Sequence, residues 1–128
     1  MVVVIQPELR NTVDELRRIE ARVPMTELVK LVSGTVEEVI SHLPTASIAH
    51  FACYGTQHAK NPLESALLLR DRRLLTVQQI MQYSSENAML AFLAACQTAM
   101  GAKTIPDEII HLGSTFLFAG FPGVVATM

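Results

Sequence analysis

The sequence has 128 residues, enough for one domain around one hydrophobic core. Half of the residues are hydrophobic and the mean hydropathy is +0.33, which favours a sheet buried on both faces or a piece of a larger core. The net charge of −2 argues against nucleic acid or an anionic membrane as a partner.

Predicted strands and helices alternate along the first 55 residues. Apolar runs typical of buried strands occupy residues 2–5, 27–32 and 48–53. The two stretches between them carry apolar side chains at helical spacing. Strand-helix-strand alternation of this kind predicts right-handed crossovers and a parallel sheet.

Three helix starts are predicted from capping boxes, in which a Thr hydroxyl and a Glu or Gln side chain satisfy free backbone amides. They are Thr12–Glu15, Thr35–Glu38 and Thr76–Gln79. Pro24 and Pro44 stop the first two helices, because proline cannot continue the hydrogen-bond ladder.

The middle of the chain predicts a loop, a hairpin and another strand. Residues 55–65 are polar and loop-like. Residues 67–69 and 74–75 predict a short hairpin that turns at Asp71 and Arg72. The apolar run at residues 89–95 predicts the next core strand.

The last predicted elements are one helix and one strand. Pro106, Asp107 and Glu108 favour a helix start, since proline and acidic residues suit the first turn. Gly120 is the expected C-cap of that helix. Residues 124–127 predict a final strand, which carries no charge or proline to protect its edge.

Tyr54 and Cys96 each follow an apolar run, and both should emerge at the carboxyl edge of a parallel sheet. Adjacent strands lie about 4.8 Å apart, so side chains at their ends can meet. A thiol becomes a useful nucleophile beside a base or a cation. A cysteine peptidase of the caspase type would place its base where Tyr54 stands.

His50, Cys53 and His58 have a spacing that is also seen in metal sites. They are only three ligands, and strand alternation sends His50 and Cys53 to opposite faces. We therefore expect no metal and no cofactor, and we interpret Cys53 as a core residue. The two cysteines indicate reduced thiols in a cytoplasmic protein.

Several segments closely resemble the CHAT domain, and together they cover essentially the whole chain. They are residues 50–55 (His-Phe-Ala-Cys-Tyr-Gly), 61–69 (Asn-Pro-Leu-Glu-Ser-Ala-Leu-Leu-Leu), 90–99 (Leu-Ala-Phe-Leu-Ala-Ala-Cys-Gln-Thr-Ala), 107–112 (Asp-Glu-Ile-Ile-His-Leu) and 118–128 (Phe-Ala-Gly-Phe-Pro-Gly-Val-Val-Ala-Thr-Met). The match is to the fungal type, often found behind tetratricopeptide repeats. The resemblance implies a caspase-like, mostly parallel α/β sheet with helices on both faces, and a His-Cys peptidase dyad.

Carried over by position, Cys96 matches the family nucleophile and Tyr54 occupies the place of the dyad His. A phenol keeps its proton at neutral pH and cannot act as a general base. His58 is the nearest substitute base by sequence. Relatives continue beyond Met128, so we interpret residues 1–128 as a CHAT domain that is incomplete at its C-terminus, or as a gene fragment.

Three functions stay open from the sequence. The favoured one is a degenerate CHAT domain without peptidase activity. The second is an active cysteine endopeptidase with Cys96 as nucleophile and a relocated His base. The third is a non-catalytic interaction or scaffold module whose partner is a protein or peptide. Tetratricopeptide repeats encoded upstream, and self-association through the last strand, are further expectations.

Overall fold

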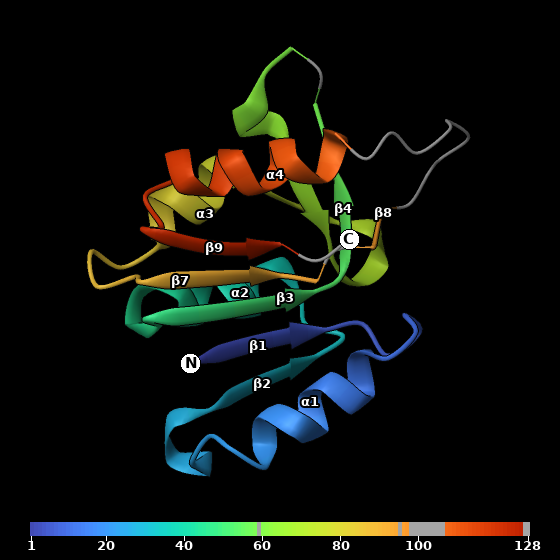
Figure 1. The fold of residues 1–128 in the computed structure, drawn as a ribbon, viewed down its shortest axis with the longest axis vertical. Coiled ribbons are helices and arrows are strands. Elements are labelled where there is room, and N and C mark those ends of the chain that lie inside the picture. Colours follow the sequence, from blue (N-terminus) through green and yellow to red (C-terminus); the bar gives the residue numbers. More distant parts are fainter. Residues whose placement is uncertain (59, 95, 98–106, 127–128) are drawn as a thin grey trace.

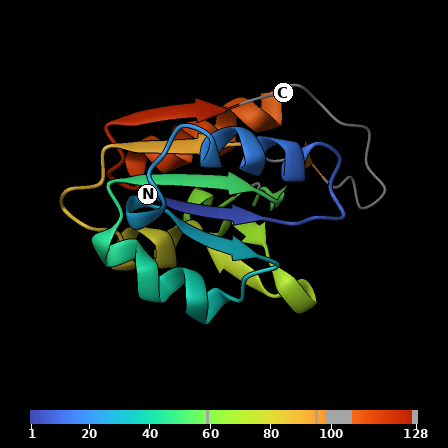
Figure 2. The same ribbon diagram turned by 90° about the horizontal axis from the view of Figure 1, so that it is seen from below.

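A computed structural model describes residues 1–58, 60–94, 96–97 and 107–126. Its main sheet has five strands, all parallel, as predicted (Figures 1 and 2). In spatial order they are β2 (Val29–Val32), β1 (Val2–Ile5), β3 (Ile48–Ala52), β7 (Leu90–Leu93) and β9 (Gly123–Ala126). The central strands are apolar and buried, as strands covered on both faces should be.

Helices cover both faces of this sheet among the described residues, which confirms the predicted α/β class. One face carries α1 (Thr12–Glu20), and the other carries α2 (Val36–His42), α3 (Val77–Tyr83) and α4 (Asp107–Phe118). Short 3-10 turns lie at Met25–Glu27, Leu43–Thr45, Pro62–Glu64 and Arg70–Arg72. No described helix combines the length and apolar character needed to cross a bilayer.

Two of the three predicted capping boxes are present. At α2, the Glu38 amide donates to the Thr35 hydroxyl over 3.2 Å, and the Thr35 amide donates to the Glu38 carboxylate over 2.7 Å. At α3, Thr76 and Gln79 make the same reciprocal pair, at 3.2 and 3.0 Å. The local sequence alone was sufficient to predict these helix starts.

The capping box predicted at Thr12 is wrong. Asn11 is the N-cap of α1, with a left-handed φ of 71° and no side-chain cap. The buried Thr12 hydroxyl instead donates to the carbonyl oxygens of Gln6, at 2.8 Å, and Leu9, at 3.0 Å. Glu15, the expected partner of the box, reaches His50 of β3. Tertiary contacts outweigh the local motif here.

A second, smaller sheet lies beyond the carboxyl ends of the main strands (Figure 1). Its order is β6 (Leu74–Thr76), β5 (Ala66–Leu68), β4 (Tyr54–Thr56) and β8 (Cys96–Gln97). The antiparallel β5–β6 pair confirms the predicted hairpin. The predicted loop at residues 55–65 is wrong at its start, because β4 pairs with β5 across that loop.

The end of the described chain agrees with the sequence prediction. Gly120 has a φ of 98° and donates its amide to the Leu117 carbonyl oxygen, which makes it the C-cap of α4. The strand predicted at 124–127 is β9, an edge strand of the main sheet. Pro106 and Thr127 lie outside the described residues, and self-association through this edge stays a prediction.

Candidate functional site

The backbone places Tyr54 and Cys96 side by side. Central strands β3 and β7 are neighbours in the main sheet, and each continues into a strand of the second sheet. There β4 and β8 are parallel, with Tyr54 opposite Cys96 and Gly55 opposite Gln97. The predicted adjacency of these two strand ends is therefore confirmed for the backbone. The catalytic roles assigned to the two residues stay predictions.

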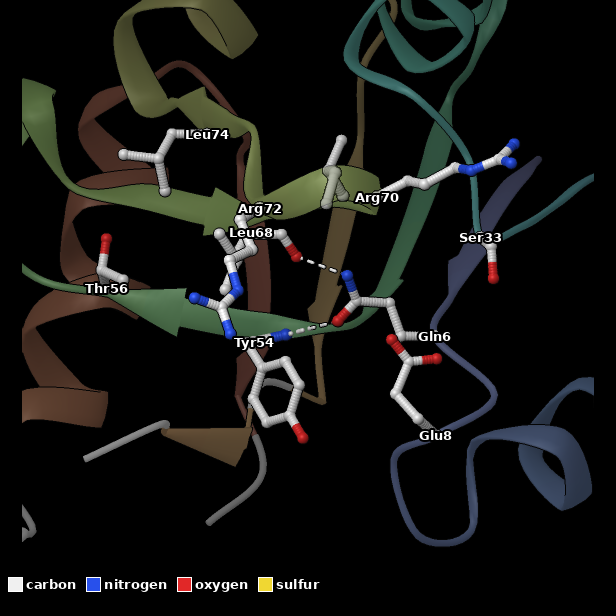
Figure 3. Close-up of a pocket in the computed structure, with 10 residues that line it drawn as sticks. Gln6, Glu8, Ser33, Tyr54, Thr56, Leu68, Arg70, Arg72 and Leu74 are labelled. Atoms are coloured by element: carbon white, nitrogen blue, oxygen red, sulfur yellow. Dashed lines mark hydrogen bonds between the residues drawn. The ribbon is translucent and has the colours of Figure 1, made fainter. Parts of the chain in front are cut away.

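Gln6 is a residue of this region that the sequence reasoning missed. It is buried, and it follows β1 at the same carboxyl edge. Its amide nitrogen donates to the Leu68 carbonyl over 2.7 Å, and its amide oxygen accepts from the Tyr54 N–H over 3.3 Å (Figure 3). Gln6 thus ties β4 to β5 at the point where the chain passes Tyr54. A polar residue directly after an apolar strand was the available signal.

A pocket of about 730 Å³ opens beside Tyr54. It is lined by Gln6, Glu8, Ser33, Tyr54, Thr56, Leu68, Leu69, Arg70, Arg72 and Leu74. The Tyr54 ring and the Glu8 carboxylate lie at the same end of it, as Figure 3 shows. This size suits a small ligand or a peptide side chain, and its walls mix apolar surface with charges of both signs.

His58, the proposed substitute base, contacts residues of its own loop. Its Nδ1 accepts from the Asn61 N–H over 2.9 Å, and its Nε2 lies 3.2 Å from the Glu64 carboxylate. Because Nδ1 is an acceptor, the ring proton resides on Nε2 and donates to Glu64. His58 is not among the described residues that line the pocket. These contacts favour a structural role for the ring.

His50 and Cys53 lie on opposite faces of the main sheet, as strand alternation predicts. Cys53 is fully buried among the residues under α2, α3 and α4. Burial raises the pKa of the Cys53 thiol to about 12, which makes this cysteine chemically inert. His50 faces α1, with its Nε2 3.3 Å from the Glu15 carboxylate and its ring centroid 5.9 Å from that of Phe92.

We expect His50 to make folding stability pH-dependent. Burial lowers the pKa of His50 below its ordinary value, and the nearby Glu15 carboxylate only partly opposes this. Below about pH 6.5 the unfolded chain binds a proton that the folded chain resists, so stability falls as the pH drops from there. Urea melts between about pH 8 and 5 should show a smaller loss for His50→Gln than for the wild type. The control variant His42→Gln should lose as much stability over this pH range as the wild type. A loss in His42→Gln that is as small as the loss in His50→Gln would contradict the prediction.

Comparison with known proteins gives one finding on the family. The family model of the CHAT domain matches residues 2–128, a span that includes Gln6, Tyr54 and Cys96. No curated protein matches the sequence.

Proposed function

Because the chain belongs to the CHAT domain family, a caspase-like peptidase family, we propose that it is a degenerate member without peptidase activity. One observation carries this proposal: the residue paired with Cys96 across β4 and β8 is Tyr54. By the motif resemblance, Tyr54 stands where the family carries its dyad His. A phenol holds its proton at neutral pH, so it cannot activate a thiol as imidazole does.

The contacts of His50 and His58 support the same proposal. His50 is buried against α1, and His58 is bonded to Asn61 and Glu64. Neither belongs to the described lining of the pocket beside Tyr54. A thiol without a base beside it is mostly protonated at neutral pH, so attack on a peptide carbonyl is slow.

Two other functions are kept as alternatives. An active endopeptidase would require His58 to leave Asn61 and Glu64 and approach Cys96. A non-catalytic interaction module would use the pocket beside Tyr54 to hold a protein or peptide, which its size allows. The motif resemblance also supports a more detailed proposal. We propose that the chain is a CHAT domain of the fungal type, encoded behind tetratricopeptide repeats, and that it acts in the cytoplasm.

Titration of the Cys96 thiol tests the proposal directly. Without an activating base, the rate at which iodoacetamide alkylates Cys96 should rise with pH and reach half of its maximum near about pH 8.5, as for an ordinary cysteine. The measurement is clean because Cys53 is fully buried with a pKa of about 12 and should not react in the folded protein. Mass spectrometry of the alkylated peptide checks the site.

Two variants serve as controls for this titration. Cys96→Ser should abolish the rapid labelling and leave Cys53 unlabelled. His58→Gln should leave the midpoint unchanged if His58 has only its structural role. A midpoint below about pH 7 in the wild type would overturn the proposal, because it would reveal an activating neighbour. If the His58→Gln change then restored the ordinary midpoint, the relocated-base alternative would replace it.

A further inference from the structure

The pocket beside Tyr54 is formed mainly by three segments that meet beyond the carboxyl ends of β1 and β3. The loop after β1 contributes Gln6 and Glu8, and β4 contributes Tyr54. The hairpin of β5 and β6 contributes Leu68, Leu74 and the turn that joins its strands. All of the lining residues fall within positions 6–74, so neither α4 nor β9 takes part in the lining.

Arg72 lies in the turn of this hairpin, in a backbone conformation that arginine rarely adopts. Its φ is 60°, within the left-handed region that favours glycine because a side chain there crowds the backbone. The turn is held in place from both sides. The Leu69 N–H donates to the Arg73 carbonyl oxygen over 2.8 Å, and the Arg73 guanidinium lies 2.6 Å from the Glu37 carboxylate of α2. Strain that the surroundings impose in this way is typical of residues that bind ligands.

Two exposed side chains of opposite charge, Arg72 and Glu8, line the pocket. Within the part of the chain that the structure describes, neither one forms an ion pair or a side-chain hydrogen bond. The Arg72 guanidinium points toward Tyr54, and the Glu8 carboxylate lies on the other side of the Tyr54 ring (Figure 3). Arg70 extends away from Tyr54 toward Ser33 and has a partner of its own. The pocket therefore offers a ligand one cation and one anion.

This charge arrangement selects among classes of ligand. A guanidinium binds a carboxylate through two parallel hydrogen bonds, and a carboxylate accepts hydrogen bonds from a basic side chain. A phosphate dianion would gain from Arg72 but would be repelled by Glu8 in the same pocket. A peptide can satisfy both charges, because side chains two residues apart on an extended segment lie on one face about 7 Å from each other. Leu68 and Leu74 offer apolar surface to the stems of such side chains.

We propose that the pocket beside Tyr54 binds an extended peptide segment that carries one acidic and one basic side chain on the same face. Arg72 binds the carboxylate, Glu8 binds the basic group, and the two leucines of the hairpin contact the apolar stems. Binding of this kind needs no reaction at Cys96. The inference is therefore independent of whether the chain is a peptidase.

Fluorescence anisotropy with short labelled peptides tests the inference. The protein carries the Cys96→Ala change, so that no probe can be cleaved during the titration. The probes share a central leucine, flanked by glutamate and lysine, glutamine and lysine, glutamate and glutamine, or two glutamines. Each mixed probe is made in both orders, and the tighter-binding order is compared. The glutamate–lysine probe should bind at least about fivefold tighter than the probe with two glutamines, because two charge-assisted contacts are added.

The variant Arg72→Gly separates binding from folding. Glycine suits a φ of 60°, so this change should not lower the melting temperature. It should reduce the affinity of the glutamate–lysine probe to that of the glutamine–lysine probe, whose own affinity should not change. Glu8→Gln should likewise reduce the affinity of the glutamate–lysine probe to that of the glutamate–glutamine probe.

Arg73→Gln is the matched control for the hairpin. Arg73 pairs with Glu37 and is not among the described residues that line the pocket, so this change should leave the affinity of every probe within about twofold. Three results would overturn the inference: no binding at all, equal affinity for the glutamate–lysine probe and the probe with two glutamines, or a preference for glutamate that survives Arg72→Gly.

Discussion

We expect the protein to release no peptide product beyond the rate of its own Cys96→Ala variant. Loss of a catalytic partner lowers the rate by about 10⁴-fold in comparable triads, which brings turnover to the detection limit. The physical reason is the pairing of Cys96 with Tyr54, a phenol that cannot take the thiol proton at neutral pH. A fluorogenic peptide library, varied at the residue before the cleaved bond, is the measurement.

Variants at the three candidate residues separate the possible outcomes of this assay. Tyr54→Phe should change nothing, because the hydroxyl is assigned no part in the chemistry. Turnover that disappears in Cys96→Ala and persists in His58→Gln would contradict the proposal without supporting a relocated base. Turnover lost in both variants would establish the endopeptidase alternative.

The largest stability effect is expected for Phe116→Ala, at about 3–5 kcal/mol of unfolding free energy. Phe116 of α4 is fully buried, and its ring centroid lies 5.9 Å from that of Phe51 and 6.0 Å from that of Phe121. Removing the ring loses apolar burial and leaves a cavity where α4 meets the sheet. Urea unfolding followed by circular dichroism gives the difference, provided the transition is two-state.

Phe118 provides a matched control on the same helix. It is 83% exposed, so the same Phe→Ala change there should shift the unfolding free energy by no more than about 0.5 kcal/mol. Equal losses at Phe116 and Phe118 would show that α4 is not anchored through Phe116. A loss under about 1 kcal/mol at Phe116 would lead to the same conclusion.

The sequence by itself determined the elements that depend on local patterns. The apolar runs predicted the core strands β1, β3 and β7, because a strand buried on both faces has little room for polar residues. The Thr-x-x-Glu/Gln motifs at α2 and α3 predicted their starts, since both partners of a capping box lie within one turn. The parallel order then followed from alternation, and it placed Tyr54 near Cys96.

Contacts between distant segments were decided by the tertiary structure alone. Thr12 and Glu15 have the right spacing for a capping box, but Gln6 and His50 compete for their side chains from other elements. β4 is a strand because it pairs with β5 and β8. The local sequence of its three residues does not predict a strand.

The candidate site divides in the same way. Cys96 and Tyr54 were predictable, because the ends of parallel strands meet at one edge. The clamp made by Gln6 and the loop contacts of His58 were not. Side-chain hydrogen bonds of this kind depend on how distant elements pack in space, and local sequence patterns do not predict that packing.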